Sequence, residues 1–334
     1  MLIKIIHDIH AASAYTDLDK SFCVTKPYDG KISLQFDMPI KHPLYSYIEE
    51  ETELVYENQR YYVKGLNERS RPGICTINAE LDLKTLQNKL YISKTWTDVS
   101  LDDFMSDILY FTGWHCDNAK LINKKTTIVA EGNTPLDLLE KCTDITAFGV
   151  CYGYDTRQNL ITCIQPEKSL TTAKCYFVED LNLSELTMKG SSSQVVTRLY
   201  PIGKDGLTIE SVNNGLPYIE DHRFTDFDIC KIWRDERYTN AQSLKNDAIA
   251  KLATMAAPIR SYTCKITDLA KTNPETYGDM LNFKLYDKVI IIDRIRRRRI
   301  AQQIVEIKEY PADHSLDTVI LSSVPARITR VKRN

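Results

Sequence analysis

The sequence lacks the signals that would assign an activity or a membrane location directly. It contains no H-E-x-x-H, G-x-S-x-G or G-x-x-x-x-G-K-[ST] pattern, which are the signatures of the common zinc, serine and phosphate-binding mechanisms. It has no apolar run of the roughly 20 residues that a helix needs to span a bilayer. Its opening segment, MLIKIIHDIHA, alternates apolar and polar residues, which is typical of a first strand and not of a secretion signal. We therefore expect a soluble protein.

Cysteine is present, but not in a pattern that binds a metal or builds a disulfide framework. The nine cysteines are an odd number and include no C-x-x-C pair. This spacing favours buried free thiols in a chain that folds in reducing cytosol. We expect no metal and no cofactor.

Length and charge limit the class of protein further. The 334 residues allow two or three domains, and 43% apolar with 26% charged residues is an ordinary globular composition. The formal net charge of -2 creates no overall field that would draw the molecule to nucleic acid or to an acidic membrane. A partner attracted by charge must therefore use a local patch.

Residues 1–90 have a β pattern. Apolar side chains alternate at Ile32, Leu34 and Phe36, and turn residues follow at Tyr28-Asp29-Gly30 and Glu57-Asn58-Gln59. Several short strands with frequent turns predict a small closed barrel or a sandwich, and closure into a barrel would also hide the sheet edges.

Residues 91–190 have the pattern of a compact α/β module. Ser100 precedes an apolar stripe from Leu101 to Leu109 as an N-cap, and Gly113 can adopt a left-handed cap after it. Thr134-Pro135 starts a second helix that reaches Cys142. Strands are predicted at 150–154, 160–165 and 174–178.

The rest of the chain predicts a second β region that is interrupted by an insertion. Val195, Thr197 and Leu199 read as a strand that Pro201 closes, and Lys204-Asp205-Gly206 reads as the turn of a hairpin that resumes at 207–209. A helix at 243–256 ends before Pro258. Further strands are predicted at 261–266, 284–293, 300–310 and 318–322.

These patterns predict an α+β multidomain protein with two small antiparallel β-barrels, an intervening α/β module and a helical insertion. The expected boundaries are 1–90 for the first barrel, 91–190 for the α/β module, 191–209 with 259–326 for the second barrel, 210–258 for an inserted α/β or helical subdomain, and 327–334 for a basic tail.

Four segments, in this order along the chain, resemble the tail-hub proteins of bacterial viruses. They are DVSLDDFMSDILYFTGW at 98–114, EGNTPLDLLEKC at 131–142, VVTRLYPIGKDGLTIESVNNGLPYIED at 195–221 and YGDMLNFKLYDKVIIID at 277–293. The resembled family includes the tail-associated lysins, or prophage endopeptidase tail proteins, of long-tailed phages and the central baseplate hub of contractile tails.

The resemblance implies a structural hub at the virion tail tip, made in the cytoplasm of a bacterial host. In such proteins two similar barrels per subunit combine in a homotrimer to form a ring, which joins a sixfold tail tube to a threefold tip. The implied partners are the distal tail protein ring, the tape-measure protein and receptor-binding or baseplate proteins, with DNA passing transiently through the channel.

The resemblance also bears on catalysis. Many family members continue into a segment that cleaves peptidoglycan or reaches a receptor, whereas this sequence stops at Asn334. We therefore expect no enzyme activity and no catalytic residues.

Two histidine-containing segments are candidates for reactive sites. His7 and His10 offer two imidazoles, but residues three apart on a strand face opposite sides of a sheet and do not chelate one ion. His115-Cys116-Asp117 contains a thiol and a base, but adjacent positions on an extended chain point apart, and a packed cysteine at a helix exit is the simpler reading. We predict no metal site and no nucleophile at these places.

Charged runs are the remaining candidates. Glu49-Glu50-Glu51 and Asp102-Asp103 read as solvated carboxylates and not as acid/base pairs. The segment from Arg294 to Arg299 lies between two predicted strands and allows three readings, namely a solvated hairpin end, a contact with carboxylates of a neighbouring subunit, or a contact with DNA phosphates. Arg327, Arg330, Lys332 and Arg333 form a basic end that is either mobile or a contact to another tail component.

Two functions from other classes stay open at this point. A tail-associated peptidoglycan hydrolase would need a clustered catalytic set. A host receptor-binding or carbohydrate-binding module would need an exposed aromatic patch, for which the 19 tyrosines provide material.

Overall fold

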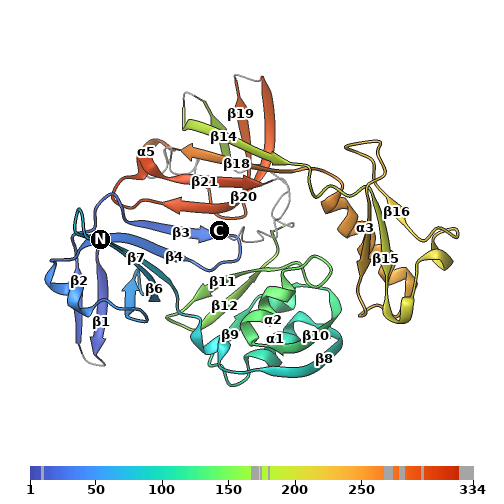
Figure 1. Cartoon of the computed structure of the whole chain (residues 1–334), viewed down its shortest axis with the longest axis horizontal. Helices are drawn as coiled ribbons and strands as arrows, with labels where there is room; N and C mark the ends of the chain where they lie inside the picture. Colours follow the sequence, from blue (N-terminus) through green and yellow to red (C-terminus); the bar gives the residue numbers. More distant parts are fainter. Residues whose placement is uncertain are drawn as a thin grey trace.

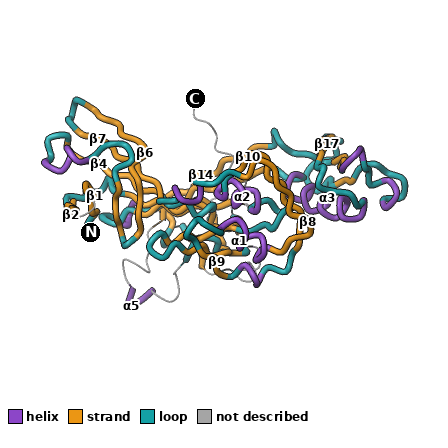
Figure 2. The backbone as a smooth tube through the Cα atoms, turned by 90° about the horizontal axis from the view of Figure 1, so that it is seen from below, coloured by secondary structure: helices purple, strands orange, loops and turns teal. Residues whose placement is uncertain are grey.

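The computed structural model describes residues 1–8, 11–166, 173, 175–179, 181–266, 274–277, 283–294 and 297–322 of a mostly β chain. The strands form one sheet of 13 strands and three small sheets. Figure 1 shows the large sheet beside an α/β module, with a third unit around helix α3 at one end. The same unit lies at one extreme of the molecule in the perpendicular view, opposite the N-terminal strands (Figure 2).

The N-terminal part of the large sheet is antiparallel. Its order is β3-β4-β7-β6-β5-β1-β2. The strands are β1 Ile3–Asp8, β2 Ala11–Tyr15, β3 Cys23–Pro27, β4 Ser33–Pro39, β5 Glu53–Tyr56, β6 Gln59–Arg69 and β7 Ile74–Leu81. In β4, Leu34, Phe36 and Met38 are buried, which is the alternation that predicted a strand here. Glu57 and Asn58, both with positive φ, form the tight turn that connects β5 to β6.

The C-terminal part of the large sheet joins this N-terminal part directly. Its strands are β13 Cys175–Val178, β14 Leu183–Ser191, β18 Ile259–Ile266, β19 Lys288–Asp293, β20 Arg298–Glu309 and β21 Thr318–Ser322. β20 pairs with β19 and β21, and its last residues, from Glu306 to Glu309, also pair with β3. At this seam the Lys26 Nζ and the Glu309 Oε2 are 2.7 Å apart.

The predicted closure into two barrels is not confirmed. Across the described residues the main sheet is an open path that runs from β14 to β2, with β13 and β19 branching from β20. The reason lies in the pairing of β3, because the edge that a closed N-terminal barrel would use is occupied by β20. A register shift between Ile304 and Glu306 marks the place where β20 changes partners.

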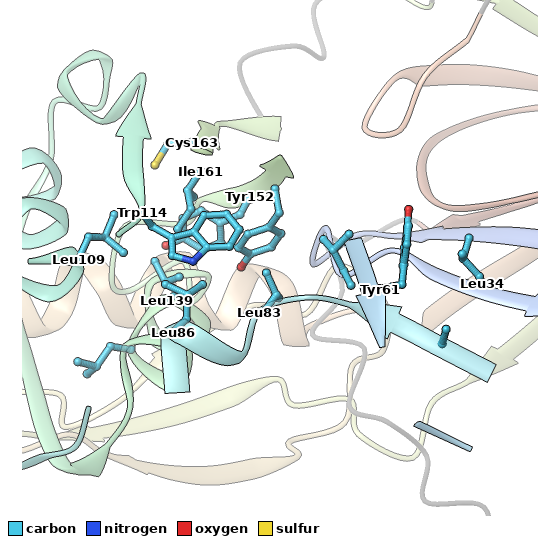
Figure 3. Packing of buried hydrophobic residues seen from close by; sticks show 14 of the residues in the cluster. Leu34, Tyr61, Leu83, Leu86, Leu109, Trp114, Leu139, Tyr152, Ile161 and Cys163 are labelled. Carbon is cyan, nitrogen blue, oxygen red and sulfur yellow. The ribbon is translucent and has the colours of Figure 1, made fainter. Parts of the chain in front are cut away.

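The α/β module packs on the N-terminal strands. It contains α1 Leu101–Leu109, α2 Pro135–Cys142, and the strands β8 Tyr91–Ser100, β9 His115–Asp117, β10 Lys125–Asn133, β11 Cys151–Asp155 and β12 Leu160–Ile164. Both helices begin where the sequence predicted, at the N-caps Ser100 and Thr134. One hydrophobic cluster runs from the N-terminal sheet into the module, and Figure 3 shows Leu83 between Tyr61 on one side and Tyr152 with Trp114 on the other.

The third unit is built from β15 Arg198–Ile202, β16 Ile219–Glu220, β17 Cys230–Arg234 and α3 Ala241–Met255. Its own hydrophobic cluster includes Leu199, Leu244 and Leu252. Its ends are adjacent, because Ser191 at the end of β14 pairs with Ile259 at the start of β18. The unit therefore leaves the large sheet and returns to it at one point.

Two sequence predictions differ from the structure in this region. The hairpin expected at 195–209 does not form, since β15 pairs with β16 and β17 and no strand occupies 207–209. Asp205 and Gly206, both with positive φ, do make the predicted turn. The 91–190 range predicted for the α/β module includes β13 and most of β14, but both strands belong to the large sheet. The expected domain boundaries stay predictions apart from these strand assignments.

The remaining described helical elements are short: η1 Pro43–Tyr47, η2 Lys84–Gln87, η3 Ala119–Leu121, η5 Lys204–Gly206, η6 Glu210–Val212, α5 Pro274–Tyr277 and η7 His314–Leu316. Within the described ranges, no helix has the length and apolar character needed to cross a membrane.

Candidate functional site

The Cys116 thiol points toward another cysteine. His115 and Asp117 are exposed while Cys116 is half-buried, as expected for alternating residues of strand β9. The Cys116 Sγ lies 3.4 Å from the Cys163 Sγ on β12, the strand that runs parallel to β9. The hydrogen bond from Cys163 lowers the pKa of Cys116, and the same contact raises the pKa of Cys163. The segment is thus a short strand, and not the helix exit that the sequence indicated.

Members of both carboxylate runs have structural partners. Asp103 accepts a hydrogen bond from the Ser100 Oγ and its backbone N–H donates to the same oxygen, so this side chain stabilises the start of α1. Glu51 lies between the ammonium groups of Lys64 and Lys84, whose hydrogen bonds lower the pKa of its carboxyl. These arrangements give Glu51 and Asp103 electrostatic roles on the surface.

The arginine run lies at the end of the β19–β20 hairpin. Arg294 and Arg297 are exposed in the turn, and Arg299 is exposed at the start of β20. The Arg294 backbone N–H donates to the Glu179 Oε2 at 2.9 Å. Together with Ile292 and Asp293, these three arginines line a shallow depression of about 290 Å³. The geometry is that of a cationic hairpin end, and its partner stays a prediction.

Some candidate residues lie outside the described part of the chain. These are His10, Arg296 and the basic end with Arg327, Arg330, Lys332 and Arg333. The backbone of His7 lies in β1, but its side chain also falls outside. The proposed contacts of these residues therefore stay predictions.

The TGW turn after α1 buries one aromatic ring and exposes two. Trp114 is buried and its Nε1 donates to the Thr85 Oγ1 at 2.7 Å. The Thr112 Oγ1 donates to the Leu109 carbonyl and accepts from the Trp114 N–H, which fixes the turn. Tyr110 and Phe111 are left outside, and Phe111 is 81% exposed with a φ of 74°. The helix thus ends earlier than Gly113, the cap that we expected.

A second polar cluster was not found from the sequence. Arg198 on β15, Glu220 on β16, and His222 and Asp228 in the segment between β16 and β17 meet on one side of the third unit. The His222 Nε2 lies 3.6 Å from the Glu220 Oε1 and 3.5 Å from the Asp228 Oδ1. The hydrogen bond from Arg198 lowers the pKa of Glu220. The pairing of β15 with β16 and β17 brings these residues together. The sequence pattern predicts a different pairing, a hairpin within 195–209, and so does not predict this cluster.

Comparison with known proteins assigns the fold and the family. Three solved tail proteins of known prophages or bacteria have the same fold. Prophage tail protein gp18 from Listeria monocytogenes EGD-e is 19% identical with a TM-score of 0.67, and the match covers 98% of this chain and 95% of that one. The 43 kDa tail protein of prophage MuSo2 from Shewanella oneidensis is 14% identical with a TM-score of 0.66, covering 97% and 98%. The tail protein from Neisseria meningitidis MC58 is 8% identical with a TM-score of 0.63, covering 96% and 95%.

The sequence comparison with curated proteins finds no match. Two family models match consecutive parts of the chain, the prophage endopeptidase tail N-terminal domain at residues 5–80 and the prophage endopeptidase tail at residues 171–332. The first covers most of the N-terminal strands and the second covers the third unit with the C-terminal strands. With both parts present in this order, the chain belongs to the prophage endopeptidase tail family.

Proposed function

We propose that this phage tail protein is a non-enzymatic structural hub of the tail tip or baseplate. The observation that carries the proposal is the family match at both ends of the chain, at 5–80 and 171–332. The large sheet adds support, because the seam between β3 and β20 joins the two matched parts. Such a continuous sheet is suited to bear load between tail components.

The arrangement of the C-terminal strands supports a barrel-like second half. Six strands, β13, β14, β18, β19, β20 and β21, contribute to one hydrophobic cluster that includes Phe177, Tyr262 and Ile291. The chain passes from β13 to β14 through a short turn with an isolated bridge between Glu179 and Leu183. We propose that this half acts as one of two ring-forming units in each subunit.

The finer proposal is a homotrimer that joins a sixfold tube to a threefold tip and lines the path of the genome. Three copies with two related units each would present six quasi-equivalent surfaces, which solves the symmetry mismatch. The arginine end of the β19–β20 hairpin is the proposed contact to carboxylates of a neighbouring subunit. A hub that DNA traverses should hold phosphates weakly, which favours the subunit contact over DNA binding.

The test is assembly with the cognate distal tail protein. We expect light scattering of the mixture to give three copies of this chain per complex, while the isolated chain can be monomeric at low concentration. Replacing Arg296 to Arg299 with Ser should weaken that association. The matched control is Arg71→Ser with Arg157→Ser, which removes exposed arginines from other turns. Twofold complexes, or monomers with the partner present, would contradict the hub.

The rival functions give different results in simple assays. A peptidoglycan hydrolase would release muropeptides from purified cell walls, and the non-enzymatic proposal expects none. A receptor-binding or carbohydrate-binding module would bind host cells as an isolated chain. The exposed Tyr110 and Phe111 are the observation that keeps this second alternative open.

A further inference from the structure

The spacing of donor atoms in the third unit matches that of metal ligands. Two ligand atoms that are each about 2.1 Å from a tetrahedral ion lie about 3.4 Å apart. The His222 Nε2 lies 3.6 Å from the Glu220 Oε1 and 3.5 Å from the Asp228 Oδ1. These distances are too long for good hydrogen bonds, which are about 2.7–3.2 Å, but they suit a shared ion. The three donor atoms all lie within 4.8 Å of one another.

The imidazole is oriented as a metal-ligating histidine commonly is. The His222 Nδ1 is 3.2 Å from the backbone carbonyl oxygen of Thr225. If Nδ1 carries the proton and donates to that carbonyl, the lone pair of Nε2 faces the two carboxylates. A ring held in this way loses little freedom when an ion binds.

The surrounding charge also suits a divalent cation. Glu220 and Asp228 carry two negative charges and Arg198 carries one positive charge. The Arg198 Nε donates to the Glu220 Oε1 at 2.7 Å, its Nη2 donates to the same oxygen, and Nη2 also lies 2.9 Å from the Asp228 Oδ2. The Asp228 Oδ1, on the histidine side, is the oxygen directed to the ion. Arg198 then acts as the hydrogen-bonding partner that orients the carboxylates, as outer groups do in metal sites.

We propose that Glu220, His222 and Asp228 form a binding site for a first-row divalent transition metal, with Zn²⁺ as the representative ion. One imidazole nitrogen with two carboxylate oxygens is a donor set for Zn²⁺ and its neighbours and not for Mg²⁺ or Ca²⁺, which prefer oxygen alone. Water completes the coordination.

The ion would fix the segment between β16 and β17. This segment presents Phe224 and Phe227, which are 46% and 78% exposed. Its far end is already held by Thr197, whose Oγ1 donates to the Phe227 carbonyl at 2.7 Å and accepts from the Ile229 N–H at 2.8 Å. Its near end is held by the Asp221 backbone N–H, which donates to the Thr197 carbonyl at 2.9 Å, and a metal at His222 would add an anchor between the two ends. Binding should therefore reduce tryptic cleavage after the exposed Arg223.

The experiment is titration of the full chain with Co²⁺, followed by competition with Zn²⁺. It is done in a Cys230→Ser background, because Cys230 is an exposed thiol on β17. We expect one equivalent of Co²⁺ with d–d absorption and no sulfur charge-transfer band, and slower cleavage at Arg223 when the metal is present.

Three variants decide the outcome. His222→Ala should weaken binding at least about tenfold, a loss of roughly 1.4 kcal/mol. Asp228→Asn, which keeps the shape of the side chain, should weaken it as well and serves if the first variant fails to fold. The control is His314→Ala, since His314 also pairs with a carboxylate and is 32% exposed against 31% for His222. Absence of binding, a sulfur band, or equal binding by His222→Ala and the parent overturns the proposal.

Discussion

At the residue scale, the end of α1 and the turn after it contain two apolar residues with different roles, one buried in the core and one exposed on the surface. Leu109 is 6% exposed and packs in the large hydrophobic cluster, whereas Phe111, two residues later, is 81% exposed. Phe111 also has a φ of 74°, a region that a bulky residue adopts at a cost in free energy. An exposed, strained aromatic contributes little to the fold, so its substitution is informative.

Substitutions at these two positions should therefore have opposite consequences for stability. Leu109→Asp buries an unpaired charge and should reduce the free energy of unfolding by roughly 3 kcal/mol. Phe111→Asn should leave it unchanged or raise it, because Asn adopts positive φ with less strain. Urea denaturation followed by circular dichroism measures both. Equal losses in the two variants would mean that the buried face of α1 is misassigned.

Glu306 gives a prediction about pH. Burial raises the pKa of its carboxyl, Lys308 opposes the shift and Asp29 adds to it. A folded-state pKa above the unfolded value means that stability is fully present below the unfolded pKa and declines as the pH rises through the folded pKa. Glu306→Gln should thus raise the melting temperature at pH 7, and the gain should disappear below about pH 4. Glu185→Gln, at an exposed position of β14, is the control and should change little. A gain that persists in acid would point to a cause other than ionisation.

At the element scale, local signals and long-range pairing differ in how well the sequence predicts them. The starts of α1 and α2 were predictable because the capping residues, Ser100 and Thr134, are adjacent in sequence to the turns that they stabilise. The partners of β15 were not, because β16 has only two residues and β17 is largely exposed, so neither has a clear alternation. The Glu220, His222 and Asp228 cluster depends on that same pairing and was missed with it.

The second helix offers a test of such a local signal. Thr134 and Asp137 form a capping box, in which the Thr134 Oγ1 accepts from the Asp137 N–H at 3.2 Å and the Asp137 Oδ2 accepts from the Thr134 N–H at 2.8 Å. Thr134→Ala should lower the free energy of unfolding by about 1 kcal/mol, and Thr134→Ser should largely preserve it. Chemical denaturation of the two variants measures the difference. If Ser were as damaging as Ala, the lost methyl contacts and not the hydroxyl would explain the effect.

At the scale of the whole molecule, the described side chains pack into three separate hydrophobic clusters. One spans the N-terminal strands and the α/β module, one lies within the C-terminal strands, and one belongs to the third unit. Sequence periodicity identifies which residues are buried, but it does not say which clusters merge. Residues 1–90 and the α/β module share one hydrophobic core, and the periodicity of apolar residues in the sequence does not indicate this.

The third unit should be removable without loss of the rest, although the hydrogen bonds from Arg237 to the Thr127 carbonyl and the Thr146 Oγ1 of the α/β module are removed with it. Residues 192–258 leave and return where Ser191 pairs with Ile259, so an Asn-Gly turn in their place would connect β14 to β18 as a hairpin. We expect the shortened chain to be folded, with the near-ultraviolet circular dichroism of the remaining aromatic residues and cooperative unfolding. A molten product would show that the unit stabilises the large sheet.

The seam between β3 and β20 also determines when the fold can be completed on the ribosome. Lys26 and Glu309 are separated by 283 positions, and translation adds about 5–20 residues per second. Roughly 15–60 s therefore pass between the emergence of β3 and that of its second neighbour. During this interval the outer edge of β3 is an unpaired template for any strand nearby, including the β20 of a chain ahead on the same message. We therefore expect exchange of β20 between nascent chains to be the main route of misassembly for this topology.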